Sequence, residues 1–302
     1  MAADRKPCGG FIANGLNTDK VQDVQKVQAV QNGKFDVGRQ AVARPGDTIQ
    51  NRKPVLSKAE ASAIENLKRR LVEGVQVITG EGVLSGSGHL SARIPGAETF
   101  LINPRFAGVL ADPKDICTVT FDGKRIAGKG PIPSESPIHA AVYKSRSDVN
   151  SVIHCHARYS ILVGLLEGGL IPFNREARIF ADGVPTFHES RGINDFALAQ
   201  RMVDNLGPHY ATFLRGHGVV VVGPGVEGTC ISAIQLERAC QDQLLMMSIG
   251  EVKPMADAGR GRSNARLENP YRAWPFLLWK HKVKSKAQIR AGIRTLKEGE
   301  HY

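Results

Sequence analysis

Helical spacing is the first regular pattern of apolar and polar residues along the chain. Between residues 64 and 75, apolar side chains recur every three or four positions. Before this stretch, Ser57 and Glu60 have the spacing of a capping box, in which each side chain bonds the other residue's backbone N–H. After it, Gly80 and Gly82 interrupt the pattern. We therefore predict an amphipathic helix that begins after Ser57 and stops near Gly80.

Short β-forming runs replace the helical pattern from residue 89 onward, and Pro-Gly, Asn-Pro and Asp-Gly pairs separate them. Strands are predicted at 90–94, 100–102, 116–121, 212–214 and 219–222, with another ending in the run 151–157. Helices are predicted at 135–143, 159–166, 194–206 and 226–249, with Asn194 as one N-cap. Because tight turns join the early strands, a mixed or antiparallel sheet covered by helices is favoured over a strictly parallel one.

Length and composition narrow the class of protein. With 302 residues, 42% of them hydrophobic, the chain is long enough for one substantial α/β core or two small domains. No uninterrupted run of 18 apolar residues exists, and residues 1–14 lack the apolar centre of a secretory signal, so neither a membrane span nor secretion is expected. Five cysteines without the spacing of a disulfide framework fit reduced thiols. Together these features predict a cytoplasmic protein.

Positive charge is concentrated towards the end of the sequence. Residues 251–302 hold twelve Lys and Arg against five Asp and Glu, and thus +7 of the formal net charge of +11. Because the other 250 residues are nearly balanced, a nucleic-acid partner is not expected. A small anionic substrate would still be attracted to such a surface.

Three regions are predicted along the chain. Residues 1–52 are poor in large apolar side chains, which is typical of a flexible or partner-docked arm. Residues 53–250 carry the periodic patterns and form the folded body. Residues 251–302 form a basic, aromatic extension, which we expect to contact another subunit or to cover a neighbouring site.

His154 and His156 are the residues most informative about chemistry. Val152 and Ile153 lead into them with β-forming side chains, and alternate residues of a strand point to the same face. Two imidazoles at this spacing lean towards a common point and can form two corners of a metal site. With His217 they are a sufficient ligand set for Zn²⁺, Fe²⁺ or Mn²⁺.

Each candidate also has a purely structural interpretation. The His-Xaa-His pattern arises by chance, and a histidine between Gly216 and Gly218 suits a turn in which a backbone carbonyl binds the ring. Glu135 stands at the start of a predicted helix, where the helix dipole favours its charge and its side chain can act as a cap. The residues taken singly leave both interpretations open.

The order of the motifs resembles the class II aldolase and adducin family. The resemblance covers roughly residues 57–250 and rests on Pro133-Ser-Glu-Ser-Pro-Ile-His139, Tyr143-Lys-Ser-Arg-Ser-Asp-Val149, His154-Cys-His156 and Gly216-His-Gly218. It implies that His154, His156 and His217 bind a divalent metal, Zn²⁺ first, with Fe²⁺, Mn²⁺ or Co²⁺ as alternatives. It implies Glu135 as the catalytic acid/base or a fourth ligand. It also implies a three-layer α/β/α fold with a mixed, mostly antiparallel central sheet, and a homotetramer with active sites between subunits.

The expected substrate pocket departs from that of the family's sugar-phosphate aldolases, which bind phosphate with a Gly-Asn-Xaa-Ser turn, a Thr-Gly pair and two serines before the glutamate. Here His89 replaces the asparagine, Arg105-Phe106 replaces the Thr-Gly pair and Pro133 replaces the first serine. Proline has no N–H and phenylalanine no polar group, so a phosphate cradle is not expected. Arg105 can instead make two hydrogen bonds to a planar carboxylate.

Five residues are expected to contact the substrate. Ser91 and Ser134 are the counterparts of hydroxyls that bind phosphate in the family, and Glu176 lies near the place where fuculose-phosphate aldolase has a catalytic tyrosine. The other two are His89 and Arg105.

These observations favour a metal-dependent carbon–carbon lyase, in particular a decarboxylase of a hydroxylated aromatic or keto carboxylate. Glu135 would move the proton and Arg105 would orient the carboxylate. Three alternatives remain: a sugar-phosphate aldolase or epimerase, an iron-dependent oxygenase on the same fold, and a non-catalytic adducin-like binding module. The first requires a phosphorylated ketose, the second O₂ and Fe²⁺, and the third would be unaffected by the change His154→Ala.

Overall fold

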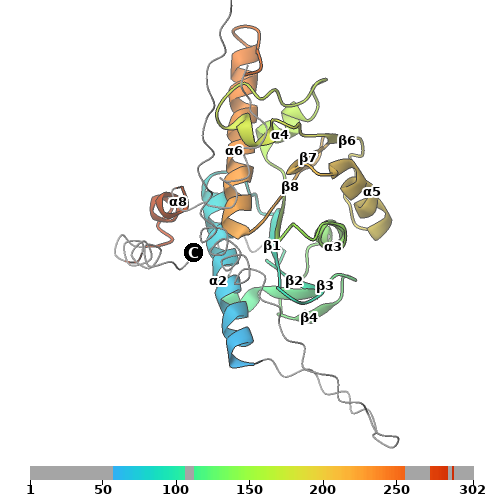
Figure 1. The fold of residues 1–302 in the computed structure, drawn as a ribbon, viewed down its shortest axis with the longest axis vertical. Helices are drawn as coiled ribbons and strands as arrows, with labels where there is room; N and C mark the ends of the chain where they lie inside the picture. The colour runs from blue at the N-terminus through green and yellow to red at the C-terminus, as the bar shows by residue number, and fades with distance from the viewer. Residues whose placement is uncertain (1–56, 106–111, 256–272, 285–287, 289–302) are drawn as a thin grey trace, which may run out of the picture. The chain divides into compact units, whose positions relative to one another are not determined.

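A computed structural model of the chain describes residues 57–105, 112–255, 273–284 and 288 (Figure 1). The predicted arm at 1–52 and most of the extension at 251–302 lie outside the described residues.

The centre of the fold is an eight-stranded sheet with the strand order β4-β3-β2-β1-β5-β8-β7-β6. Every neighbouring pair is antiparallel except β6 and β7, which confirms the predicted mixed, mostly antiparallel sheet. The strands are β1 (His89–Arg93), β2 (Thr99–Ile102), β3 (Cys117–Thr120), β4 (Arg125–Ala127), β5 (Ser151–Cys155), β6 (Thr186–Phe187), β7 (Ala211–Leu214) and β8 (Gly218–Gly223).

Helices cover both faces of this sheet and give the three-layer α/β/α architecture (Figure 1). The side chains of β5 alternate between the two layers: Ile153 packs into the apolar core beneath α2, α4 and α6, and Val152 into the core beneath α3 and α5. The helices are α2 (Lys58–Gly80), α3 (Ser136–Ser145), α4 (Arg158–Val163), α5 (Phe196–Leu206), α6 (Val226–Met247) and α8 (Trp274–Lys280), with 3₁₀ turns at Pro113–Asp115 and Ala177–Phe180.

The helix ends test the predictions made from local sequence. The capping box is present: the Glu60 N–H donates to Ser57 Oγ at 3.2 Å, and the Ser57 N–H donates to the Glu60 carboxylate at 2.8 Å. Asn194 as N-cap of α5 is wrong, because Asp195 takes this position and accepts the Leu198 N–H at 2.7 Å. Both residue types cap well, so composition could not fix the register.

The short helix α8 packs against α2 and belongs to the same core as α2 and α6. Trp274, Leu277 and Leu278 are buried in that core. At its end, Lys280 and His281 each donate to the carboxylate of Glu81, which follows α2. No helix among the described residues has the length and apolar character needed to cross a membrane.

Candidate functional site

The site forms where β5 ends beside the turn that enters β8. His154 is paired with His89 of β1 on one side and with Val220 of β8 on the other, which fixes its backbone in the middle of the sheet. Its side chain points towards the layer that contains α3, together with that of Val152 two residues earlier. His156 follows the strand end, and His217 lies in the turn between β7 and β8.

The two glycines around His217 are required by the geometry of that turn. Gly216 has a φ of +66°, a conformation that L side chains rarely adopt. Gly218 lies so close to the neighbouring strand that a Cβ there would be 2.5 Å from the Cys155 carbonyl oxygen and 3.0 Å from the His156 ring. The Gly-His-Gly motif therefore places His217 against His156.

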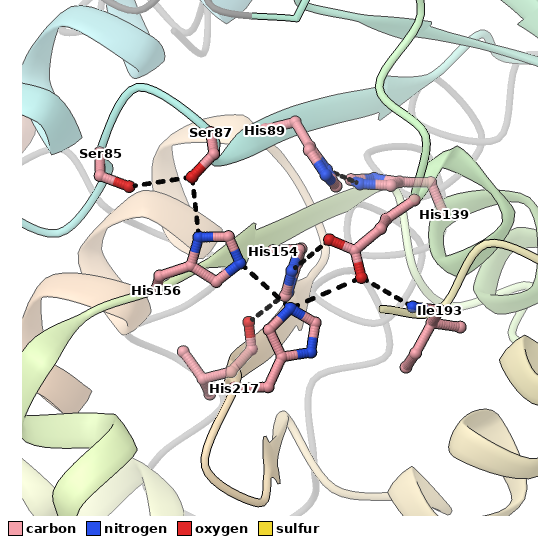
Figure 2. Close-up of polar contacts among 10 residues, drawn as sticks. Ser85, Ser87, His89, His139, His154, His156, Ile193 and His217 are labelled. Carbon is pink, nitrogen blue, oxygen red and sulfur yellow. Dashed lines mark hydrogen bonds and ion pairs between the residues drawn. The ribbon is translucent and has the colours of Figure 1, made fainter. Parts of the chain in front are cut away.

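Four side chains converge at this point, as Figure 2 shows for the three histidines. One ligand atom from each of Glu135, His154, His156 and His217 can be chosen so that all four lie within 4.8 Å of one another. His154 Nε2 is 3.2 Å from Glu135 Oε2, and His156 Nε2 is 3.2 Å from His217 Nε2. His217 Nε2 is 3.6 Å from Glu135 Oε1.

This donor set fits a divalent transition metal. In a tetrahedral site with bonds of about 2.0–2.1 Å, neighbouring ligand atoms lie about 3.3–3.4 Å apart, close to the three separations above. Imidazole nitrogen and carboxylate oxygen are both ligands of Zn²⁺, and imidazole also suits iron. The structure thus brings together the four residues predicted from the sequence. Within the described part of the chain, they form the cluster of His and Glu side chains whose spacing could hold a metal ion.

Hydrogen bonds behind the centre orient two of the rings. His154 Nδ1 is 3.1 Å from the Val219 carbonyl oxygen. The carbonyl accepts a hydrogen bond from Nδ1–H, so the lone pair of the ring is on Nε2. His156 Nδ1 is 2.9 Å from Ser87 Oγ. His217 differs, because its Nδ1 is buried without a hydrogen-bond partner among the described residues. Ser87 was not predicted, and the Val219 carbonyl has no signature in the sequence.

Glu135 does not act as the side-chain cap that its position suggested. It is the N-cap residue of α3, but its carboxylate makes no cap hydrogen bond. Oε1 instead accepts the Ile193 N–H at 2.8 Å, while Oε2 faces His154. Burial opposes ionisation of this carboxyl, but the neighbouring His154 and His217 rings and the Ile193 N–H outweigh it and lower its pKa. Glu135 is therefore ionised at neutral pH.

The His156 ring is suited to binding metal as a neutral ligand. Burial, together with the neighbouring His154 and His217, lowers the pKa of His156 to about 4.

Cys155, between His154 and His156, points to the opposite face of the sheet and is buried in the other core, as expected from strand alternation. Burial raises the pKa of its thiol to about 12, so it has no thiolate character at neutral pH.

The predicted substrate residues have different surroundings. His89 is buried, and its ring centroid lies 5.1 Å from that of His154. Ser91 is completely buried and hydrogen-bonded to His139 and Tyr143, which places it behind the centre. A direct contact of Ser91 with a substrate stays a prediction.

The other three remain candidates on the outside of the site. Arg105 is exposed, and its N–H donates to the Pro131 carbonyl at 2.9 Å, which places it beside the loop that leads to Glu135. Ser134 is exposed and immediately precedes Glu135, while Glu176 is half-buried. Their contact with a substrate stays a prediction. Pro133 is buried, and Phe106 lies outside the described residues.

Comparison with known proteins identifies the family. The profile described as Class II Aldolase and Adducin N-terminal domain matches residues 70–244. The chain therefore belongs to the class II aldolase and adducin family.

Individual relatives are distant. A candidate aldolase class 2 protein of Caulobacter vibrioides is 33% identical over 169 residues, which cover 54% of this chain and 65% of that protein, slightly less than two thirds of its length. A 3,4-dihydroxyphthalate decarboxylase of Arthrobacter keyseri is 28% identical over 190 residues, covering 58% and 76% of the two chains. The solved L-fuculose 1-phosphate aldolase of Glaciozyma antarctica is similar in fold, with a TM-score of 0.63 and 24% identity over 76% of this chain and 96% of that one.

Proposed function

We propose that this protein is a metal-dependent carbon–carbon lyase, and specifically a decarboxylase of a hydroxylated aromatic carboxylate. The observation that carries the proposal is the convergence of His154, His156, His217 and Glu135, with ligand atoms within 4.8 Å of one another. The similarity to 3,4-dihydroxyphthalate decarboxylase supports the choice of substrate class. A non-catalytic binding module would have no use for a complete ligand set.

The proposed chemistry assigns one task to the metal and the others to the protein. His154, His156 and His217 hold the metal, with Glu135 as a fourth ligand or as acid/base. A bound Zn²⁺, or Fe²⁺, Mn²⁺ or Co²⁺ in its place, supplies Lewis acidity that stabilises negative charge on substrate oxygens. The ionised Glu135, held by the Ile193 N–H, is positioned to accept the proton of a substrate hydroxyl.

The proton and electron balance of decarboxylation then closes with these residues and one proton from water. Glu135 would deliver the hydroxyl proton to the ring carbon that bears the carboxylate, the bond between that carbon and the carboxylate would break, and CO₂ would leave as the electron pair restores the aromatic ring. Hydrogen thus replaces the carboxylate, the phenolate oxygen regains a proton from water, and no oxidant is consumed. Arg105, beside the Glu135 loop, is proposed to orient a carboxylate, with Ser134 and Glu176 at the outside of the pocket.

The test compares two substrates on one preparation. Purified protein would be assayed with 3,4-dihydroxyphthalate for CO₂ release and with L-fuculose 1-phosphate for cleavage, after loading with Zn²⁺, Mn²⁺, Co²⁺ or Fe²⁺. We expect metal-dependent CO₂ release, abolished by EDTA and by His154→Ala. Cleavage confined to the phosphorylated sugar would make the protein an aldolase. Turnover that requires O₂ together with Fe²⁺ would make it an oxygenase.

Absence of bound metal, combined with no effect of His154→Ala in any assay, would instead favour the adducin-like module. The homotetramer also stays a prediction, and light scattering during size-exclusion chromatography measures it directly.

A further inference from the structure

A chain of four hydrogen-bonded side chains leads away from the metal centre into the protein interior. His89 Nδ1 is 2.6 Å from His139 Nε2, and His139 Nδ1 is 2.6 Å from Ser91 Oγ. Ser91 Oγ is in turn 2.6 Å from the Tyr143 hydroxyl. The members alternate between β1 and α3 and are all buried. None of these four side chains belongs to the candidate ligand set. A fully hydrogen-bonded network of buried polar groups fixes the orientation of its members.

The two ends of the chain differ. At the inner end, the Tyr143 hydroxyl has Ser91 as its side-chain partner among the described residues, and its ring lies 4.9 Å from the Arg93 guanidinium. At the outer end, the His89 ring is beside that of His154, with centroids 5.1 Å apart (Figure 2). His89 Nε2 has no hydrogen-bond partner among the described residues and is not one of their buried unpaired nitrogens, so it retains access to the solvent side of the centre.

Each group in the chain carries one mobile proton. Burial, reinforced by the neighbouring His154, lowers the pKa of His139 to about 3, so this ring is neutral. Burial raises the pKa of Tyr143, so its hydroxyl stays protonated. A neutral imidazole donates from one nitrogen and accepts at the other. His139 can donate to only one of its two partners, so the three hydrogen bonds of the chain are consistent with either an inward or an outward direction of the His139–Ser91 bond.

Hydrogen-bond satisfaction separates these two arrangements. If His139 donates inward to Ser91, only one of the Ser91 and Tyr143 hydroxyls can donate to the other, so one of the two protons is left without a side-chain acceptor in a buried environment. If the chain runs outward, Tyr143 donates to Ser91, Ser91 to His139 and His139 to His89, so no buried proton is left unpaired. A backbone hydrogen bond from Val152 lowers the Tyr143 pKa, which is the effect of an N–H and not of an acceptor, and so does not rescue the inward arrangement. The outward arrangement is preferred because an unmet buried donor is costly.

We propose that Tyr143, Ser91 and His139 are positioning residues that fix His89 as the Nε2-protonated tautomer, so that it presents an N–H donor beside the metal centre. This N–H donates a hydrogen bond to an oxygen of the substrate, either a carboxylate oxygen or a phenolic oxygen on which negative charge develops. This assignment of the ligand rests on the proposed lyase function, whereas the tautomer does not. The sequence predicts His89 as a pocket residue but does not indicate whether its ring donates or accepts a hydrogen bond there.

The tautomer can be measured without any enzyme assay. Protein labelled with ¹⁵N-histidine, with and without the diamagnetic ion Zn²⁺, would be examined by long-range ¹H–¹⁵N correlation spectra, and the His89 signals assigned by their loss in His89→Gln. We expect a proton on Nε2 and none on Nδ1. In Tyr143→Phe the end donor is missing, and we expect His89 to become a mixture of both tautomers. Tyr159→Phe is the matched control, because Tyr159 lies outside this chain, and it should leave the His89 signals unchanged.

Activity measurements distinguish a positioning role of Tyr143 from a role in folding. Tyr143→Phe should lower kcat for CO₂ release from 3,4-dihydroxyphthalate by about tenfold to a hundredfold while zinc content and thermal unfolding stay near those of Tyr159→Phe. His89→Gln, which can supply an N–H near the same place, should retain more activity than His89→Leu. A wild-type His89 protonated on Nδ1 would overturn the proposal. If the tautomer is as expected but no lyase activity exists, the proposed function fails and the hydrogen-bond chain stands.

Discussion

Glu135 and His154 come from different layers of the fold, yet Glu135 Oε2 and His154 Nε2 lie 3.2 Å apart. One residue immediately precedes α3, and the other lies in the centre of the sheet, on β5. The carboxylate is also bound by the Ile193 N–H at 2.8 Å, so three separate segments meet at one carboxyl group. The Glu135 carboxylate is therefore held in one orientation by contacts that a helix-capping role does not require.

The first prediction concerns that carboxylate. Glu135→Gln keeps the shape of the side chain but removes the charge and the ability to accept and return a proton. We expect metal-dependent turnover to fall by about 10²–10⁴-fold, the range of general acid–base catalysis, with zinc content reduced only modestly because three histidines remain. Steady-state kinetics and metal analysis measure the two effects. Glu98→Gln, at an exposed position, is the control and should change neither.

The second prediction concerns Ser87, which supports His156 through a 2.9 Å contact with Nδ1. Groups that orient a ligand from behind typically contribute tenfold to a hundredfold to metal affinity. Ser87→Ala should therefore weaken zinc binding by about that factor, measured by competition with a chelator, without lowering the unfolding temperature by more than a few degrees. Ser85→Ala alters the same loop without touching the ligand, and an equal loss of affinity there would show that the effect is not specific to His156.

The residues that could hold a metal were predictable because each carries a signal that does not depend on three-dimensional information. The spacing of His154 and His156 matches strand alternation, and the glycines beside His217 indicate a constrained turn. The order of these motifs then selected one family. The sequence therefore predicted which residues come together at the candidate metal site.

The supporting contacts were not predictable for a physical reason. The contact of Ser87 with His156 joins residues 69 positions apart, and the Ile193 and Val219 contacts use backbone groups that every residue possesses. The strands β4 and β6, of three and two residues, are too short to show a period. The partners of Ser91, His139 and Tyr143, lie 48 and 52 positions away in the chain, so they could not be predicted from the sequence either.

The third prediction concerns the close approach at Gly218. An alanine Cβ would lie 2.5 Å from the Cys155 carbonyl oxygen and 3.0 Å from the His156 ring, so β5, β8 or the ligand must move. We expect Gly218→Ala to lower the free energy of unfolding by about 1–3 kcal/mol, the usual cost of overpacking, and also to weaken zinc binding. Urea denaturation and metal titration check both. Gly86→Ala is the control, because a Cβ at Gly86 meets no atom within 4 Å.

The fourth prediction concerns Glu81, which connects α2 with α6 and α8. Its carboxylate accepts hydrogen bonds from Arg238, Lys280 and His281, each at 2.6 Å. Burial would raise its pKa, but these three partners outweigh burial and lower it to about 2. Because the folded-state pKa lies below the ordinary value of 4.5, the contribution to stability is complete above about pH 5 and disappears as the pH falls towards 2.

Glu81→Gln should therefore lower the free energy of unfolding at pH 7 by about 1–2 kcal/mol, a modest value because the Arg238 and Lys280 side chains are 48% and 43% exposed and their charges are screened. The difference between wild type and variant should stay constant from pH 7 to pH 5 and shrink below it. Tryptophan fluorescence during urea unfolding is a suitable measurement, since the buried Trp274 of α8 reports directly on the docking of this helix. A difference that persists undiminished at pH 3 would show that the Glu81 charge does not stabilise the attachment of α8.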